Sequence, residues 1–259
     1  MTIFLYLALM NALAQTGNET SATVSPASGK DTMPYEKEFR KYHSLAGMLS
    51  YGLKAGINQN NIYGSEIDYI FATPNTQSLL SIHAGLLINT QWNKYFWLKH
   101  ELLFSTRGAL VTLNDSIHGE YSSKFKTLYL DLFPVSPSLH FKGLQFYGGP
   151  YLSILANACI QRKNENGDYF NDRSIFGTPE NREGEDENKY LQKFDYGLHA
   201  GVEYQFSFGL LIGVKYLHGL ADIFQYANSF TNDDTKTNPI KIYNKSIMFS
   251  VGYTRTRKR

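Results

Sequence analysis

The sequence of 259 residues has little of what marks several common classes of protein. It contains one cysteine, Cys159, so no internal disulfide can form and a disulfide-stapled secreted scaffold is excluded. Charged residues make up only 19% of the chain and the formal net charge is +2, which is too little for an extended nucleic-acid-binding surface. Nucleic acid is therefore not an expected partner.

Long hydrophobic runs are also missing. No stretch after the N-terminus approaches the roughly 18 apolar residues that a membrane-spanning helix needs. The apolar run over residues 3–13 is shorter, and Ala12 and Ala14 supply small residues before a cleavage point. We therefore expect residues 1–14 to be a signal peptide and the chain to be exported without a helical anchor.

Residues 15–48 form a polar segment rich in Ser, Thr and Asn, with Pro26 and Pro34 and no periodic apolar face. Such a composition cannot bury a core and is typical of a flexible leader. We expect one folded domain, residues 49–259, to follow it.

What the sequence has in abundance is aromatic residues, with 19 Tyr, 17 Phe and 2 Trp, or 15% of the chain. A soluble core rarely needs so many tyrosines, whereas membrane barrels place amphipathic rings where hydrocarbon meets headgroups. Many rings fall beside short predicted turns, as in an aromatic girdle: Trp92, Tyr95, Phe96, Trp97, Phe141, Phe146, Tyr147, Tyr204, Phe206 and Phe208.

From residue 49 onward, apolar and polar residues alternate with the period of two that indicates β-strands. The clearest segment is 193–207, where Phe194, Tyr196 and Leu198 alternate with Asp195 and Gly197. Eight segments follow this pattern: 49–59, 79–91, 95–109, 125–140, 144–157, 193–207, 209–219 and 243–254. An even number of strands of this kind predicts an all-β, antiparallel barrel.

The connections between these segments strictly alternate in length. Short ones fall near residues 93–94, 142–143 and 207–209, and long ones near 60–78, 110–124, 158–192 and 221–242. Outer-membrane barrels show this alternation, with tight periplasmic turns and longer external loops. We expect an eight-stranded, up-and-down transmembrane β-barrel of OmpA/OmpX-like size with both termini on the periplasmic side.

One face of the predicted strands carries bulky apolar residues, and the other carries glycines and charges of both signs. An eight-stranded barrel has an interior just wide enough for side chains, so the polar face is expected inside and the apolar face against lipid. The opposite arrangement, a soluble lipocalin-like ligand-binding barrel, is the alternative. The predicted lumen charge network, whose expected role is structural pairing rather than conduction, consists of Lys54, Lys99, Glu101, Arg107, Asp131, Asp195, Glu203 and Lys215.

Short motifs in these strands resemble the outer-membrane β-barrel family of the Bacteroidota, often called PorT-like. They are Gly52–Asn58, Glu101–Gly108, Leu128–Leu132, Gly148–Tyr151, Tyr216 with Gly219-Leu220, and Gly252-Tyr253. The resemblance covers residues 50–254 and implies an outer-membrane barrel, in a family of which some members support protein secretion. Two features depart from the family pattern. Pro134 falls one residue later than the family proline, which predicts a bulge in the fourth strand, and a basic tail follows Tyr253.

An outer-membrane lipid-modifying hydrolase is a second alternative, because small barrels can host such enzymes. No G-x-S-x-G elbow is present, and Ser116 with His118 is the one conceivable arrangement of a nucleophile and a base. Calcium could bind the oxygen-rich third loop, but its acidic residues lack EF-hand spacing. These residues are Asn164, Asn166, Asp168, Glu183, Glu185, Asp186 and Glu187. We therefore expect no cofactor, no metal and no catalytic site.

The expected function is a non-enzymatic, structural or interaction role in the bacterial outer membrane, for example as an accessory to protein secretion. Lipid of that membrane is one expected partner. A protein partner is expected at the external loop over residues 158–192, because long loops on a rigid barrel commonly serve binding.

Overall fold

The computed structural model describes residues 49–64, 66–173, 191–224 and 241–257. The predicted signal peptide and leader lie outside these ranges. Within the described ranges, no helix is both long enough and apolar enough to cross a membrane.

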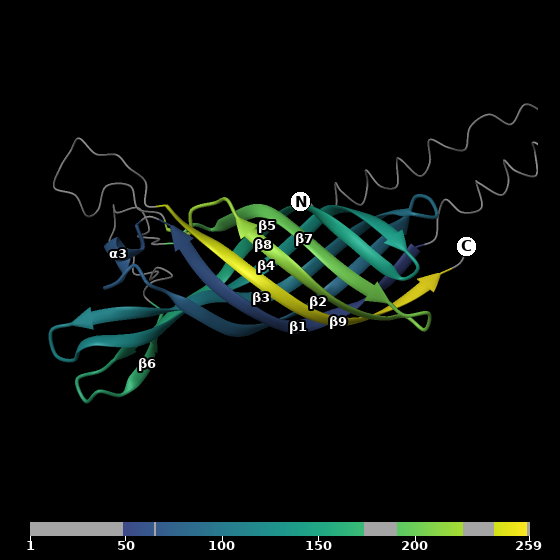
Figure 1. Ribbon diagram of the computed structural model, residues 1–259. Helices are drawn as coiled ribbons and strands as arrows, with labels where there is room; N and C mark the ends of the chain where they lie inside the picture. The colour runs from purple at the N-terminus through teal and green to yellow at the C-terminus, as the bar shows by residue number, and fades with distance from the viewer. Residues whose placement is uncertain (1–48, 65, 174–190, 225–240, 258–259) are drawn as a thin grey trace, which may run out of the picture. The chain divides into compact units, whose positions relative to one another are not determined.

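Nine antiparallel strands form one sheet, and eight of them close into a ring (Figure 1). The ring strands are β1 (Leu49–Gly64), β2 (Gln77–Gln91), β3 (Phe96–Asp115), β4 (Gly119–Phe141), β5 (Leu144–Lys163), β7 (Phe194–Gln205), β8 (Leu210–Gly219) and β9 (Ile242–Arg257). Each pairs with its neighbour along the chain, and β1 pairs with β9 to close the barrel. The prediction of an eight-stranded, antiparallel, up-and-down barrel is confirmed.

The short turns follow from local chemistry. Lys142 and Gly143, between β4 and β5, both have positive φ, at 48° and 90°. A two-residue hairpin turn with positive φ at both positions matches the right-handed twist of the strands that it joins. Between β2 and β3, the Asn93 side-chain oxygen accepts hydrogen bonds from the backbone N–H groups of Tyr95 and Phe96, both at 2.8 Å.

The bulge predicted in the fourth strand is present. Between β3 and β4, the pairing of Lys99 with Ser136 is followed by that of Glu101 with Phe133. Pro134 and Val135 therefore lie opposite one residue of β3, and proline, which has no N–H to donate, is tolerated at such a bulge.

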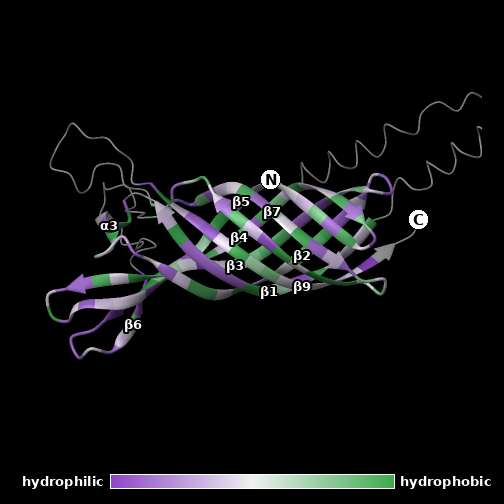
Figure 2. Ribbon diagram, in the orientation of Figure 1, coloured by the Kyte–Doolittle hydropathy of each residue, from purple (hydrophilic) through white to green (hydrophobic). Residues whose placement is uncertain are grey.

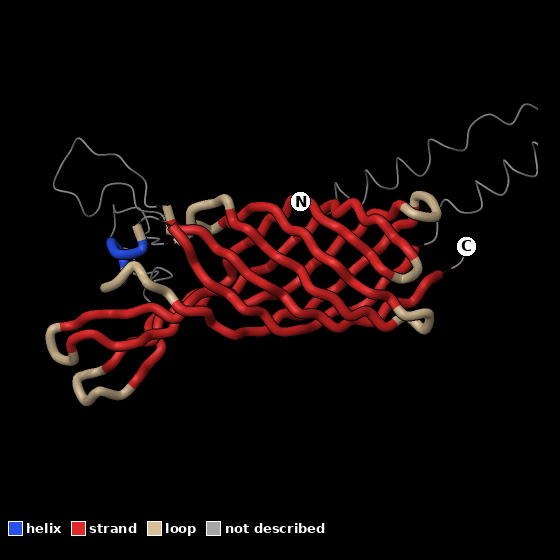
Figure 3. The backbone as a smooth tube through the Cα atoms, in the orientation of Figure 1, coloured by secondary structure: helices blue, strands red, loops and turns tan. Residues whose placement is uncertain are grey.

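The connection predicted over residues 110–124 is largely strand, and so is the described beginning of the one predicted over residues 158–192. Over residues 110–124, β3 and β4 continue as a paired hairpin, and β5 runs on to Lys163, where it pairs with β6 (Tyr169–Asp172). These hairpins project beyond the rest of the barrel at its long-loop end, where the short helix α3 (Ile67–Ile70) also lies (Figures 1 and 3). These strand extensions were not predicted because their outward-facing residues are polar, for example Ser122 and Lys124. The alternation of hydropathy is therefore lost there, although the backbone pairing continues.

The two faces of the ring have the predicted orientation. Side chains such as Leu80 and Ile82 point outward and are 72% and 69% exposed, whereas Lys99 points inward and is fully buried. Figure 2 shows the same alternation as stripes of hydrophobic and hydrophilic residues around the barrel. This arrangement is the reverse of that in a lipocalin-like barrel, and bulky apolar residues on the outside suit contact with lipid.

Candidate functional site

All eight charged residues predicted in the lumen point into the barrel, and each is at most 2% exposed. Their contacts divide them into two groups. The Lys–Glu group contains Lys54, Lys99, Lys215, Glu101 and Glu203. The Arg–Asp group contains Arg107, Asp131 and Asp195. The division into groups could not be read from the sequence, because it depends on which strands face each other across the lumen.

The Lys–Glu group lies nearer the short turns and is a chain of ion pairs across the barrel. Lys54 of β1 lies between the two carboxylates and donates to Glu101 Oε1 at 2.5 Å and to Glu203. Lys215 of β8 pairs with the other oxygen of Glu101, and Lys99 of β3 pairs with the other oxygen of Glu203. Three ammonium groups therefore share two carboxylates, which gives this group a formal charge of +1.

Aromatic side chains also contact the ammonium and carboxylate groups of the Lys–Glu group. The Tyr147 hydroxyl donates a hydrogen bond to Glu203 at 2.9 Å, and its ring centroid lies 4.1 Å from Lys99 Nζ. The Phe133 ring lies 3.7 Å from Lys215 Nζ. Such cation–π contacts offset part of the cost of removing an ammonium from water. The prediction that placed Tyr147 in the aromatic girdle is wrong, because the alternation along β5 points this side chain into the lumen.

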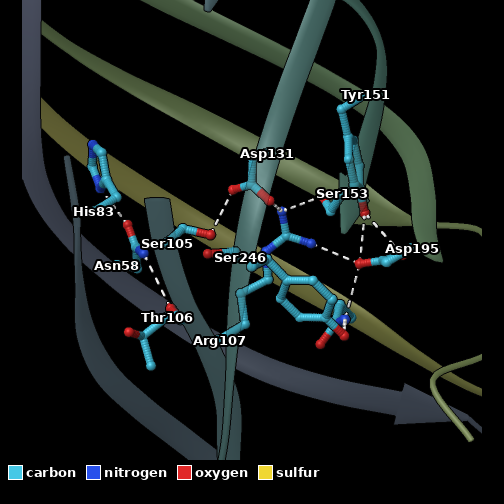
Figure 4. Close-up of polar contacts among 12 residues, drawn as sticks. Asn58, His83, Ser105, Thr106, Arg107, Asp131, Tyr151, Ser153, Asp195 and Ser246 are labelled. Atoms are coloured by element: carbon cyan, nitrogen blue, oxygen red, sulfur yellow. Dashed lines mark hydrogen bonds and ion pairs between the residues drawn. The ribbon is translucent and has the colours of Figure 1, made fainter. Parts of the chain in front are cut away.

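The Arg–Asp group lies nearer the long-loop end and is centred on one guanidinium (Figure 4). Arg107 of β3 donates from Nη2 to Asp131 Oδ1 and from Nη1 to Asp195 Oδ2, both at 2.6 Å. Ser105 donates to the second oxygen of Asp131 at 2.5 Å, and Asn244 donates to Asp195 at 3.0 Å. One cation and two carboxylates give a formal charge of −1, which balances the +1 of the Lys–Glu group.

Two apolar clusters occupy positions where the sequence led us to expect only charges and small residues. One cluster packs inside the barrel beside the charged groups and consists of Leu103, Phe133, Tyr151, Leu217 and Met248. The other, which we call the outer cap, packs strand residues such as Phe125 against Phe71, Leu191 and Phe224 from the long connections. Sequence reasoning missed the cap because its members come from four connections and strand ends with no shared local pattern.

Each glutamate of the Lys–Glu group contacts two lysines, whereas Lys99 and Lys215 contact one glutamate each. Substitutions in this group are therefore expected to differ in their effect on stability. Lys54→Met leaves each glutamate with one lysine and is expected to lower the free energy of unfolding by less than about 1.5 kcal/mol. Glu203→Leu leaves Lys99 without a carboxylate and should cost about 3–5 kcal/mol. Urea unfolding in detergent micelles measures both changes. Equal costs for the two variants would contradict this assignment of partners.

The projecting hairpins carry the other candidate residues. His118 donates its backbone N–H to the Asp115 carboxylate at 2.6 Å, and its ring Nδ1 lies 3.3 Å from the same side chain. These bonds lower the pKa of Asp115. They also tie His118 to the turn, so the structure gives no support to a catalytic pair of His118 with Ser116.

One aliphatic residue, Ile117, and two aromatic residues, Tyr169 and Phe170, lie at the surface of the same hairpins, and more than two-fifths of each is exposed. Lys163 lies 5.2 Å from the Tyr121 ring centroid and 5.4 Å from that of Tyr169.

Asn164 and Asp168 help to close the turn between β5 and β6 by local hydrogen bonds. In the described part of the chain, no group of three or more His, Cys, Asp or Glu residues could hold a metal.

The predicted girdle is present at the short-turn end for the residues that point outward. Trp92, Tyr95, Phe141 and Phe208 are each more than half exposed there. Trp97 differs, because its ring stacks on His140 with centroids 4.5 Å apart and planes 4° apart.

Solved structures with a similar arrangement are outer-membrane proteins at very low sequence identity. Ail, the attachment invasion locus protein of Yersinia pestis, in complex with the heparin analogue sucrose octasulfate, is 10% identical. That match covers 80% of this chain and 99% of Ail with a TM-score of 0.38. Neisserial surface protein A is 12% identical, with coverage of 79% and 95% and a TM-score of 0.37. AlkL is 8% identical, with coverage of 92% and 99% and a TM-score of 0.37.

No curated protein matches this sequence as a relative. A family model does match it, that of the outer membrane protein beta-barrel domain, over residues 25–225. This is more than half of the chain, and the closed ring with its apolar exterior agrees with it. The chain therefore belongs to the outer membrane protein beta-barrel domain family and is a protein of the bacterial outer membrane.

Proposed function

We propose that this protein is a closed, non-enzymatic scaffold of the outer membrane that presents its projecting hairpins to a protein partner outside the cell. The observation that carries the proposal is the combination of a filled lumen with strands that continue beyond the barrel. A barrel whose interior is packed offers no path for solutes, so we assign its function to the hairpins that project from it.

The filled lumen supports the closed state. The eight lumen charges are buried and paired, and the outer cap packs over them at the long-loop end. Opposite charges in a narrow interior hold each other because an unpaired buried charge would be costly. Conduction would require several of these pairs to separate together.

The hairpins support the display role. In barrels of this kind the short turns face the periplasm, which assigns the β3–β4 and β5–β6 hairpins to the cell exterior. Ile117, Tyr169 and Phe170 are exposed on them, beyond the part of the barrel that lipid would cover. Exposed aromatic residues such as Tyr169 and Phe170 on a rigid support are the usual anchors of protein–protein contacts. The partner site expected over residues 158–192 is thus proposed to include β6, while residues 174–190 lie outside the described residues.

Two finer assignments belong to the same proposal. The PorT-like motifs favour a barrel from the Bacteroidota whose partner belongs to a protein secretion system. The N-terminal pattern favours cleavage after residue 14, which leaves residues 15–48 as a periplasmic leader. N-terminal sequencing of the mature protein checks the second assignment directly.

The test replaces Tyr169 and Phe170 with serine in the native host, with a photocrosslinking residue introduced at Ile117. We expect the wild type to form a defined cross-linked product and the Y169S/F170S variant to lose most of it and to secrete less protein. The same purified barrel should give no stepwise conductance in planar bilayers.

The matched control is a photocrosslinker at Leu198, which points toward lipid and is 55% exposed. Cross-linking to the same partner from Leu198, or unchanged cross-linking and secretion in the variant, would refute the display role. Both variants must show the heat-dependent gel shift of a folded barrel, so that failure to fold is recognised.

A further inference from the structure

The outward-facing row of β9 marks the two edges of the apolar band. Reading from the long-loop end, four apolar residues are bracketed by two cations: Lys245, Ile247, Phe249, Val251, Tyr253 and Arg255. The ten-residue step from Lys245 to Arg255 is about 34 Å along a strand at about 3.4 Å per residue. A tilt of about 40° leaves about 26 Å along the barrel axis, close to the roughly 25 Å height of the apolar band of such barrels. Lys245 therefore lies at the outer boundary of the hydrocarbon.

Three strands meet around Lys245. Strand pairing places His218 of β8 on one side of it and Asn61 of β1 on the other. Its ammonium lies 5.7 Å from the centroid of the Tyr63 ring. The Tyr63 hydroxyl lies 3.0 Å from His218 Nε2 and donates to the carbonyl oxygen of Gly219 at 2.7 Å. These bonds fix the rings of Tyr63 and His218 beside the lysine.

The lysine lacks an acidic partner among the described residues. Each of the three lumen lysines has at least one carboxylate partner, whereas Lys245 contacts only an aromatic ring there. Asn61 does not replace a carboxylate, because its side-chain oxygen already accepts a hydrogen bond from Thr76 at 2.7 Å. An ammonium held at the edge of a low-dielectric layer is stabilised by an anion, and the neighbouring groups within the described ranges do not supply one.

We propose that Lys245 binds the phosphate of a lipid headgroup in the outer leaflet, with Tyr63 and His218 as the support that orients it. A phosphate carries oxygens that accept charge-assisted hydrogen bonds from an ammonium. Lys245 sits at the depth where the headgroup of a phosphorylated glycolipid meets its acyl chains. Ile247 and Phe249, directly below it on β9, would then contact the upper part of those chains.

The experiment counts lipids that remain on the full-length, refolded barrel in native mass spectrometry, with diphosphorylated lipid A as the probe. We expect the wild type to retain one lipid A molecule. At the same lipid concentration, the lipid-bound fraction of Lys245→Gln should be about five- to tenfold smaller, which is the effect of losing one interfacial cation. Lys245→Arg should keep the binding because it keeps the charge.

Lys124→Gln is the matched control, because Lys124 is an exposed lysine on a projecting hairpin, on the far side of the ring from β9. Equal loss in K124Q and K245Q would overturn the proposal, since binding would then reflect net charge alone. Displacement of lipid A by millimolar inorganic phosphate would also overturn it, because the site would recognise free phosphate rather than a lipid. The partner proposed for the hairpins is not involved, so this test succeeds or fails independently.

Discussion

Replacing Arg107 with leucine is expected to lower the free energy of unfolding of the barrel by about 3–5 kcal/mol, the cost of leaving buried charges without a partner. Arg107 is the only cation that contacts Asp131 and Asp195 among the described residues. Their remaining partners are neutral: Ser105 for Asp131, and Tyr151 and Asn244 for Asp195. Two carboxylates would then face each other in the lumen without compensation.

Urea unfolding in micelles, followed by the fluorescence of Trp92 and Trp97, measures this loss, and the heat-dependent gel shift reports the folded fraction. The control is Arg162→Leu, which removes an exposed guanidinium 3.0 Å from Asp172 and should cost less than about 1 kcal/mol. If the R107L variant is too unstable to refold, adding Asp131→Asn and Asp195→Asn should restore folding, because no unpaired charge then remains in the Arg–Asp group. If R107L lowers the free energy of unfolding as little as R162L does, the Arg–Asp group does not stabilise the barrel as assigned here.

The second large effect is expected at the outer cap. Phe125 is fully buried there, with ring centroids 6.0 Å from Phe71 and 5.8 Å from Phe224. Phe125→Ala removes the ring on which both connections pack and leaves a cavity, with an expected cost of about 3–5 kcal/mol. The strands below the cap do not depend on this ring, so the barrel should stay inserted while the connections loosen.

Limited proteolysis of intact cells measures this loosening, with new cleavage expected near Phe71 and Phe224. Phe104→Ala is the control, because Phe104 lies on the lipid-facing side of β3 and is 57% exposed. Lipid can fill the space that this ring leaves, so the external cleavage pattern should not change. Identical cleavage in F125A and the wild type would mean that packing in the outer cap does not protect the long connections from protease.

The sequence by itself determined the barrel. A period of two along residues 194–205 settles which side chains share a face, because successive side chains of a strand point to opposite sides whatever the strand pairs with. The same rule assigned all eight lumen charges to the interior. The bulge at Pro134 was predicted instead from the offset of this proline relative to the resembled family. The number of strands and the alternation of connection lengths were also visible, since turns and strands are encoded over a few neighbouring residues.

Only the tertiary structure decided which of these residues meet. Lys54 and Glu203 are 149 positions apart, and their contact depends on how the ring closes and on the stagger between its strands. The outer cap and the cluster of Tyr63, His218 and Lys245 have the same origin, because each gathers residues from separate strands or connections at one height. The projecting hairpins were missed because local hydropathy reports the environment of a strand and not the pairing of its backbone. A sequence pattern thus fixes the face on which a side chain lies, while its neighbours across the lumen follow from the closure of the barrel.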